Sequence, residues 1–426
     1  MTVYGKGVHM GVANADKEIL RDLARQMAEL AALPVHRKKL GMWQRLNALD
    51  SVRPMVFVTE MPWNEMNVDD EMTLRTQDEW SRKHEWELRA WIYLWKHMPV
   101  DYILNDFIAS QIVIRNSGLG MQEDVDLVET DKTSSVVSKH FHPQLIEPKD
   151  VEKIHNPTIT IDEAATEEAF TKANDVFGGI MPVRKVGFRG KFFAPWDTLI
   201  RWWGVEEAMI DLVMRPDMVR EAVKRFVDAG ISELDQMEKL NVMTLNNYNV
   251  QIGPGGYGCS TELPGKNYDP AHVRCHNMWG HDAAQIFVSV SPEMHWEFSL
   301  KEEMRWLKRW GLTYYGCCEP LDGKMDILRR IPNLRKISMS PWINVDRAVK
   351  ELKDDYVFSY KPSPAILAED GWRPEQARKV LREVLEKGRG CHIEVIMKDI
   401  STVRYKPQRL WDWAKMAMEE VEKYAK

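Results

Sequence analysis

Short apolar segments that end abruptly in polar residues recur along this chain, and helical segments lie between most of them. Parallel strands need such crossover helices, so the pattern predicts an α/β fold with a parallel sheet. About eight strand–helix units favour a (β/α)8 TIM barrel, whose active site lies at the carboxyl ends of its strands. The expected strands are 55–60, 101–106, 183–188, 242–245, 285–290, 312–315, 334–339, 357–360 and 391–397.

The main rival is a doubly wound open sheet, which usually carries a glycine-rich phosphate loop after its first strand. Here the first strand is followed by Glu60-Met61-Pro62-Trp63, which is not such a loop. The sequence therefore favours the barrel. The expected helices cover residues 16–33, 43–49, 79–97, 205–238, 293–310, 322–331, 345–353, 374–388 and 408–424.

The domain plan has two parts. Residues 1–50 are predicted to form a helical cap, because an apolar stripe of leucines runs along 16–33 and Pro34 follows it. Residues 51–426 are predicted to form the barrel, with long insertions at its carboxyl-end face. The insertion 115–182 is expected to be a lid or a partner surface, and 248–284 is a second, glycine-rich insertion.

Composition excludes several classes of protein. The net charge of −6 offers no strongly basic face, so nucleic acid is not an expected partner. Five cysteines, an odd number, argue against a disulfide framework and for a reducing, cytoplasmic location. No signal peptide and no uninterrupted apolar stretch of about 18 residues is found, so no membrane segment is predicted. A homodimer is allowed but not required.

The segment from Leu312 to Pro320 has several potentially reactive side chains close together in sequence. A strand, Leu312–Tyr315, gives way to Gly316-Cys317-Cys318-Glu319, and Pro320 prevents further strand pairing. Thiols beside a carboxylate at the carboxyl end of a strand point to a metal or catalytic site. The alternative is a pair of cysteines buried as small hydrophobic residues, with Glu319 capping the next helix.

Strand alternation sorts these side chains by face. In the last strand it puts His392 and Glu394 inside the barrel, because the residues between them and after them are apolar. A carboxylate inside a barrel is costly unless it is paired or binds a metal, which makes Glu394 a functional candidate. Along 312–319, Cys318 and Glu319 fall on opposite faces unless the chain is already turning there.

Two further motifs are weaker indications of a binding site, one for a dinucleotide and one for a metal. Residues 253–258 match G-x-G-x-x-G, but no helix starts after them, so a mobile loop over the barrel mouth is preferred to a dinucleotide site. His272, Cys275, His276 and His281 have the composition of a metal site, but only one close pair. Solvated loop histidines are the favoured interpretation.

From Arg53 to the carboxyl terminus the chain resembles the uroporphyrinogen decarboxylase superfamily. The resemblance is carried by Arg53-Pro54-Met55-Val56-Phe57, by Asn105-Asp106, by Gly187 to Ala194, by Tyr315 to Glu319 and by Lys406 to Leu410. One branch decarboxylates porphyrinogens without a metal, and another contains corrinoid-dependent methyltransferases that use zinc. Residues 315–321 and 335–342 are most similar to the methyltransferase components of anaerobic O-demethylases.

The chain departs from both branches. The arginine-rich segment of the decarboxylases is replaced by 59–63, and Gly316 stands where relatives of the methyltransferase branch carry a histidine. The resemblance therefore implies a different zinc ligand set. That set is expected to be Cys318, Glu319, Glu394 and His392.

The resemblance implies transfer of a methyl group from a methoxyaromatic compound to the cob(I)alamin of a separate corrinoid protein, with zinc polarising the ether oxygen. The alternatives are a metal-free decarboxylase and a non-enzymatic partner-binding barrel. Expected catalytic residues are Glu319, Tyr315, Asp106 and Asn247. Expected substrate-binding residues are Glu60, Trp63, Asn246 and Tyr314, since strand ends and a chain with 17 tryptophans and 24 methionines can supply an aromatic pocket.

Overall fold

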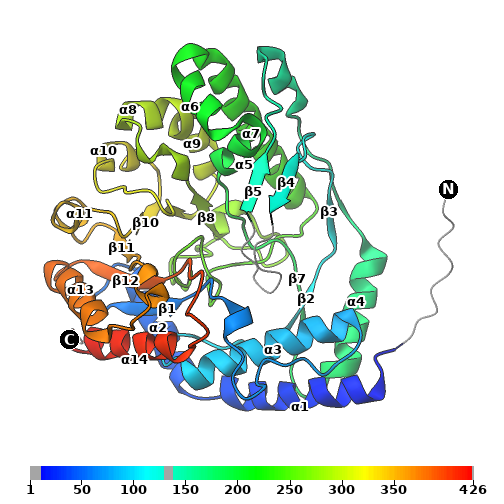
Figure 1. Ribbon diagram of the computed structural model, residues 1–426. Helices are drawn as coiled ribbons and strands as arrows, with labels where there is room; N and C mark the ends of the chain where they lie inside the picture. The colour runs from blue at the N-terminus through cyan, green and yellow to red at the C-terminus, as the bar shows by residue number, and fades with distance from the viewer. Residues whose placement is uncertain (1–10, 129–137, 425–426) are drawn as a thin grey trace.

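A six-stranded parallel sheet forms the centre of the computed structural model, which describes residues 11–128 and 138–424 (Figure 1). All neighbouring strands in it are parallel. The strands, in spatial order, are β1 (Met55–Val58), β12 (His392–Met397), β11 (Val357–Tyr360), β10 (Leu334–Met339), β9 (Leu312–Tyr315) and β8 (Trp279–Asp282). The predicted α/β class with a parallel sheet is thus confirmed.

The sheet is not closed into a barrel in the described part of the chain. β2 (Ile108–Gln111) and β7 (Val183–Val186) form a separate parallel pair. Single bridges, Phe188 to Met243 and Phe193 to Asp282, are all that continues the ring toward β8. The structure therefore shows an open parallel sheet whose curvature is compatible with a barrel.

Three predicted strands differ from the structure. Within 101–106 there is no strand, and 242–245 contributes only the bridge at Met243. The strand expected at 285–290 is wrong, because 285–288 forms the 3-10 turn η4 (Gln285–Val288). Its Phe287 is buried against Trp196, with ring centroids 4.7 Å apart, so tertiary packing overrides the β-propensity of this apolar run. The true strand, β8, reads Trp-Gly-His-Asp.

Helices cover the outer side of the sheet, which explains why strands such as β1, β9 and β11 are buried at every position (Figure 1). These helices are α5 (Pro195–Trp203), α6 (Val205–Met214), α7 (Pro216–Lys239), α8 (Pro292–His295), α9 (Lys301–Leu307), α10 (Met325–Leu328), α11 (Val345–Leu352), α12 (Ala365–Ala368), α13 (Pro374–Lys387) and α14 (Gln408–Glu422). A π-helical turn, η5 (Trp296–Leu300), joins α8 to α9. None of the described helices is long and apolar enough to cross a membrane.

The N-terminal region contributes to two cores. Helix α1 (Asn14–Ala31) packs on α3 (Glu79–His97) and α4 (Glu163–Phe177), where Leu20, Leu23 and Met27 join a separate apolar cluster. Helix α2 (Val35–Asn47) instead places Trp43 and Leu46 in the main core. In Figure 1, α1 and α3 lie together at the lower edge of the molecule.

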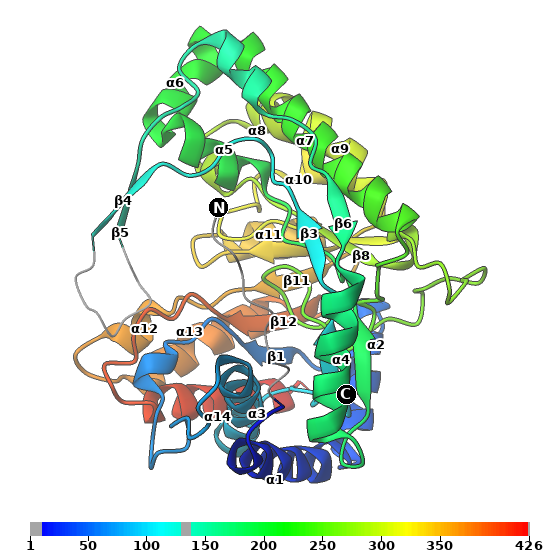
Figure 2. The ribbon, with the colours of Figure 1, turned by 90° about the vertical axis from the view of Figure 1, so that its right-hand side faces the viewer.

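The segment 115–182 is structured rather than a single loop. β3 (Ile114–Asn116) pairs with β6 (Ile159–Ile161), and β4 (Val125–Val128) pairs with β5 (Ser138–Phe141), both antiparallel. The 3-10 helix η2 (Pro148–Lys153) and helix α4 also belong to it. Figure 2 shows β4 and β5 at the edge of the molecule, away from α4.

The glycine-rich loop 252–259 is buried against the inner face of the sheet, so the prediction of a mobile loop over the barrel mouth is wrong. All of its residues except Gly253 are buried. A side chain on Gly255 would approach Tyr314 to 2.4 Å and Glu394 to 2.7 Å, and one on Gly256 would approach Trp43 to 2.3 Å. The glycines are therefore needed for close backbone approach.

Candidate functional site

The carboxyl ends of the parallel strands form one edge of the sheet. A cavity of about 480 Å³ opens beside this edge, next to β7 and β8. Ligand sites of α/β sheets are found at this edge. The cavity is lined by Gly187, Phe188, Arg189, Gly190, Lys191, Phe192, Asn246, Val250, Gln251, Ile252, Gly253, Trp279, Gly280 and His281.

His281, in β8, is the most unusual residue of this wall. It is 3% exposed, and its Nε2 lies 3.3 Å from the Gly316 carbonyl oxygen, which requires a hydrogen on Nε2. Its Nδ1 has no hydrogen-bond partner among the described residues. Burial lowers the pKa of His281 to about 3, so the ring is neutral at ordinary pH. Phe192 covers it, with ring centroids 4.2 Å apart.

Asn246 connects two backbone segments of this cavity wall at a point where the chain forms no regular strand. Its Nδ2 donates to the carbonyl oxygens of Arg189 and Trp279, both at 2.9 Å, and its Oδ1 accepts from the Trp279 amide at 2.9 Å. Its amide is thereby committed to the backbone. The Arg189 guanidinium has no hydrogen-bond or ion-pair partner within residues 11–128 and 138–424, so it is available to a ligand.

Tyr314 and Lys361 form a buried polar pair on the inner side of β9 and at the end of β11. The Lys361 Nζ lies 2.6 Å from the Tyr314 hydroxyl and 3.0 Å from the Ser359 hydroxyl. Burial lowers the pKa of Lys361 to about 8. Burial raises the pKa of Tyr314, so Tyr314 stays protonated and Lys361 is the member of the pair that titrates near pH 8.

A rim cluster lies at the ends of β9, β12 and β1, and it comprises Cys317, Cys318, Lys398, Asp399 and Glu60. Lys398 Nζ is 2.6 Å from Asp399 and 3.2 Å from Glu60. Glu60 and Asp399 both adopt the left-handed backbone region, with φ of 52° and 56°. Such strain in non-glycine residues concentrates at functional sites.

The opposite face of β8 and β9 carries a buried acidic cluster against the helices. Asp282 is buried with Glu303 of α9, and burial raises the pKa of both carboxyl groups, that of Glu303 to about 8, so this pair retains a proton. Tyr315 lies 2.7 Å from His295 Nε2 of α8 on the same side. Burial also raises the pKa of Glu319, which accepts hydrogen bonds from the amides of Cys317 and Ala284. Tyr315 and Glu319 thus face the helices rather than the cavity.

The expected zinc ligands do not come together. Glu394 is paired with Lys336 at 2.8 Å, with both side chains fully buried, and Glu319 is taken up by backbone amides. His392 lies at the amino end of β12, in a different cavity that also contains Cys391 and Tyr424. The described chain has no group of three or more histidine, cysteine, aspartate or glutamate residues that could hold a metal ion. These residues do not fit zinc.

Three other predicted site residues also lie away from the cavity. Asp106 is exposed and pairs with Arg184 at 3.6 Å. Trp63 packs on Trp86 and Tyr93, with centroids 5.5 and 5.8 Å away. Asn247 donates to the Leu263 carbonyl at 2.7 Å. Of the predicted substrate-binding residues, Asn246 lines the cavity, Tyr314 lies on the inner side and Glu60 lies in the rim cluster.

Sequence reasoning overlooked Arg189, Lys361 and Lys398 and assigned His281 to a solvated loop. The first three follow directly on predicted strands, so the rule that strand ends carry function would have included them. His281 was hidden because its strand was placed six residues too late, at 285–290 instead of 279–282.

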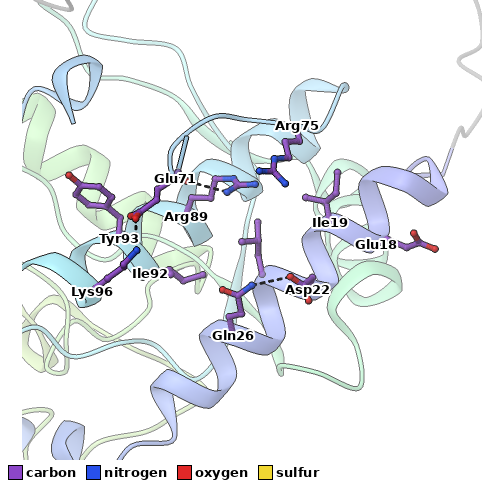
Figure 3. A pocket seen from close by; sticks show the side chains of 11 residues that line it. Glu18, Ile19, Asp22, Gln26, Glu71, Arg75, Arg89, Ile92, Tyr93 and Lys96 are labelled. Atoms are coloured by element: carbon purple, nitrogen blue, oxygen red, sulfur yellow. Dashed lines mark hydrogen bonds and ion pairs between the residues drawn. The ribbon is translucent and has the colours of Figure 1, made fainter. Parts of the chain in front are cut away.

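A second cavity, of about 540 Å³, lies between α1 and α3 (Figure 3). Figure 3 shows charged side chains of both signs along it. Lys96 pairs with Glu71, the Gln26 amide donates to Asp22 at 2.9 Å, and Arg89 donates to the Glu71 carbonyl at 3.1 Å. Because these groups largely satisfy one another and lie far from the strand ends, this groove is not the candidate site.

Comparison with known proteins gives one informative result. No protein-family model matches the chain, and no curated protein matches it in sequence. Among solved structures, the fold is similar to that of a methyltransferase from Methanosarcina mazei, with a TM-score of 0.51 over 91% of this chain and 98% of that chain and 11% identity. The similarity at this identity establishes that this chain shares the fold of that methyltransferase.

Proposed function

We propose that this protein is a methyltransferase that takes a methyl group from a methoxyaromatic compound and passes it to the cob(I)alamin of a separate corrinoid protein. The observation that carries the proposal is the aromatic-walled cavity at the carboxyl ends of the strands, in a fold similar to that of a methyltransferase. Phe188, Phe192 and Trp279 suit a flat aromatic ring. The scaffold is, on this proposal, an opened (β/α)8 barrel.

Cleavage of an aryl methyl ether leaves a phenolate, so the site must stabilise negative charge on the departing oxygen. The chain offers the Arg189 guanidinium, which lines the cavity. Zinc was the expected Lewis acid, but the residues present do not fit it, so no step depends on a metal. The corrinoid group supplies the methyl-accepting nucleophile when its carrier protein docks.

The test is methyl transfer from a panel of methoxyaromatic compounds to chemically reduced cobalamin, followed by the absorbance of methylcobalamin. Arg189→Ala should lower kcat/KM about 100-fold by removing charge stabilisation. Arg184→Ala, which alters an exposed ion pair in the neighbouring strand, is the matched control and should leave the rate unchanged. Folded protein that transfers no methyl group from any methoxyaromatic compound would refute the proposal.

A metal-free decarboxylase is the second candidate, favoured by the unpaired guanidinium of Arg189, which also suits a substrate carboxylate. The two functions differ in product. Release of carbon dioxide from an aromatic or tetrapyrrole acid, without methyl transfer, would support the decarboxylase.

A further inference from the structure

Cys317 and Cys318 place two thiols at the rim with different exposure. Their sulfur atoms are 3.6 Å apart, Cys317 is 4% exposed, and Cys318 is half-buried. The pair therefore has an outer thiol open to solvent and an inner thiol directly behind it. Cys391 is half-buried as well, but it lies in the cavity at the amino end of β12.

A lysine lies against both sulfur atoms. Lys398 Nζ is 3.8 Å from the Cys317 sulfur and 3.9 Å from the Cys318 sulfur, and Asp399 and Glu60 hold it in place. A neighbouring cation favours the thiolate, which is the nucleophilic form. The hydrogen bond from Cys317 and the Lys398 charge lower the pKa of the Cys318 thiol, and they outweigh burial and the Asp399 carboxylate, which lies 3.5 Å from the sulfur and raises it. Burial raises the pKa of the Cys391 thiol to about 11.

We propose that Cys317 and Cys318 form a dithiol centre that reacts with low-molecular-weight disulfides, with Cys318 as the attacking thiol and Cys317 as the resolving thiol. The proposal is independent of methyl transfer, because it rests on the rim cluster and not on the cavity.

The chemistry has two exchange steps. The Cys318 thiolate attacks one sulfur of a disulfide RSSR, the S–S bond breaks, and RS⁻ leaves to take a proton from water. Cys317 then loses its proton and attacks the Cys318 sulfur of the mixed disulfide, which expels the second RS⁻. The dithiol gives up two protons and two electrons in becoming a disulfide, and RSSR takes up both to become two RSH.

The product would be reduced easily. Neighbouring α-carbons across a trans peptide are about 3.8 Å apart, less than the usual separation of about 4.4–6.8 Å for bridged cysteines. Ring closure must also turn the Cys317–Cys318 peptide, whose carbonyl accepts from the Ser338 hydroxyl, while the amide of the preceding peptide, Cys317 N–H, donates to Glu319. Strained disulfides are reversible.

The experiment treats the full-length protein with oxidised glutathione and follows each cysteine by peptide mass spectrometry. Cys318 is expected to react at least ~10-fold faster than Cys391. The product should be an internal Cys317–Cys318 disulfide, which dithiothreitol reverses. Equal rates at Cys318 and Cys391, or a persistent glutathione adduct on Cys318 in the unaltered protein, would overturn the proposal.

Variants separate the two roles. Cys317→Ser should accumulate the mixed disulfide on Cys318, and Lys398→Met should slow the first step about tenfold. Cys391→Ser is the matched control and should leave the Cys318 rate unchanged. Because the rate comparison between Cys318 and Cys391 is made within the unaltered protein, it decides the proposal even if a variant fails to fold.

Discussion

Asp282 and Glu303 form a buried carboxyl pair that holds a proton. Both side chains are fully buried, and the Ser299 hydroxyl donates to Glu303 at 2.6 Å. The nearby Tyr315 and Glu319 add negative or neutral groups and no positive charge. Burial therefore raises the pKa of Glu303 from 4.5 to about 8.

This pair predicts a stability that falls as pH rises. The folded state keeps a proton that the unfolded chain releases above about pH 4.5, so the stabilisation is complete below that value and is lost as pH rises toward about 8. Glu303→Gln should flatten the slope of unfolding free energy between these two values, measured by urea unfolding. Glu302→Gln, on the less buried neighbour, should keep the slope of the unaltered protein. An unchanged slope in Glu303→Gln would contradict the assignment.

At the scale of elements, the loop 252–259 packs against the inner side of the strands and occupies space that inward-facing side chains would otherwise fill. Tyr257 packs against Phe57 of β1 with centroids 5.0 Å apart, and the Tyr257 carbonyl accepts from Lys336 Nζ of β10 at 3.2 Å. The Gly256 amide donates to Glu394 of β12 at 3.3 Å. The loop thus links β1, β12 and β10 from the inner face of the sheet.

Gly255→Ala should destabilise the protein by about 1–3 kcal/mol, because the new methyl group meets Tyr314 and Glu394 in a packed interior. Denaturant unfolding measures this change. Gly371→Ala is the control, since nothing lies within 4 Å of its added carbon. If Gly255→Ala and Gly371→Ala had the same free energy of unfolding, the loop would not be tightly packed against the sheet.

At the scale of the whole molecule, the carboxylate of Glu394 inside the sheet is paired with a lysine from a different strand. Lys336 and Glu394 are both fully buried, and Lys336 Nζ also lies 5.5 Å from the Trp43 ring and 5.7 Å from the Trp279 ring. Such a pair satisfies the carboxylate that alternation places inside the sheet. The buried Glu394 carboxylate therefore has a charged partner from the protein itself.

Elemental analysis of the purified protein should find no stoichiometric zinc, and dialysis against a chelator should leave Tm unchanged. The reason is that the expected ligands lie apart: Glu394 on Lys336, Glu319 on backbone amides and His392 at the other end of its strand. Added zinc should also leave Tm unchanged. Bound zinc at one equivalent, or a chelator-dependent fall in Tm, would refute this.

Much of the sheet could be predicted from the sequence. The strands 312–315, 334–339 and 357–360 match the structure residue for residue, because apolar runs between helices leave little freedom in their placement. β8 could not be predicted in this way, since Trp-Gly-His-Asp lacks strand character and is defined by its pairing with β9. His281 of the candidate site could not be placed from the sequence for the same reason, because it lies on β8.

Local patterns in the sequence suffice for the α/β class and the inward position of Glu394, because alternation and periodicity are local properties of the backbone. The partner of each buried group, in contrast, depends on the tertiary arrangement of the strands and loops. Lys336 is 58 residues from Glu394, and Lys398 is 80 residues from Cys318. Such pairings depend on strand order and loop path, which no local pattern encodes. They bring Lys336 to Glu394 and Lys398 to the sulfur atoms of Cys317 and Cys318.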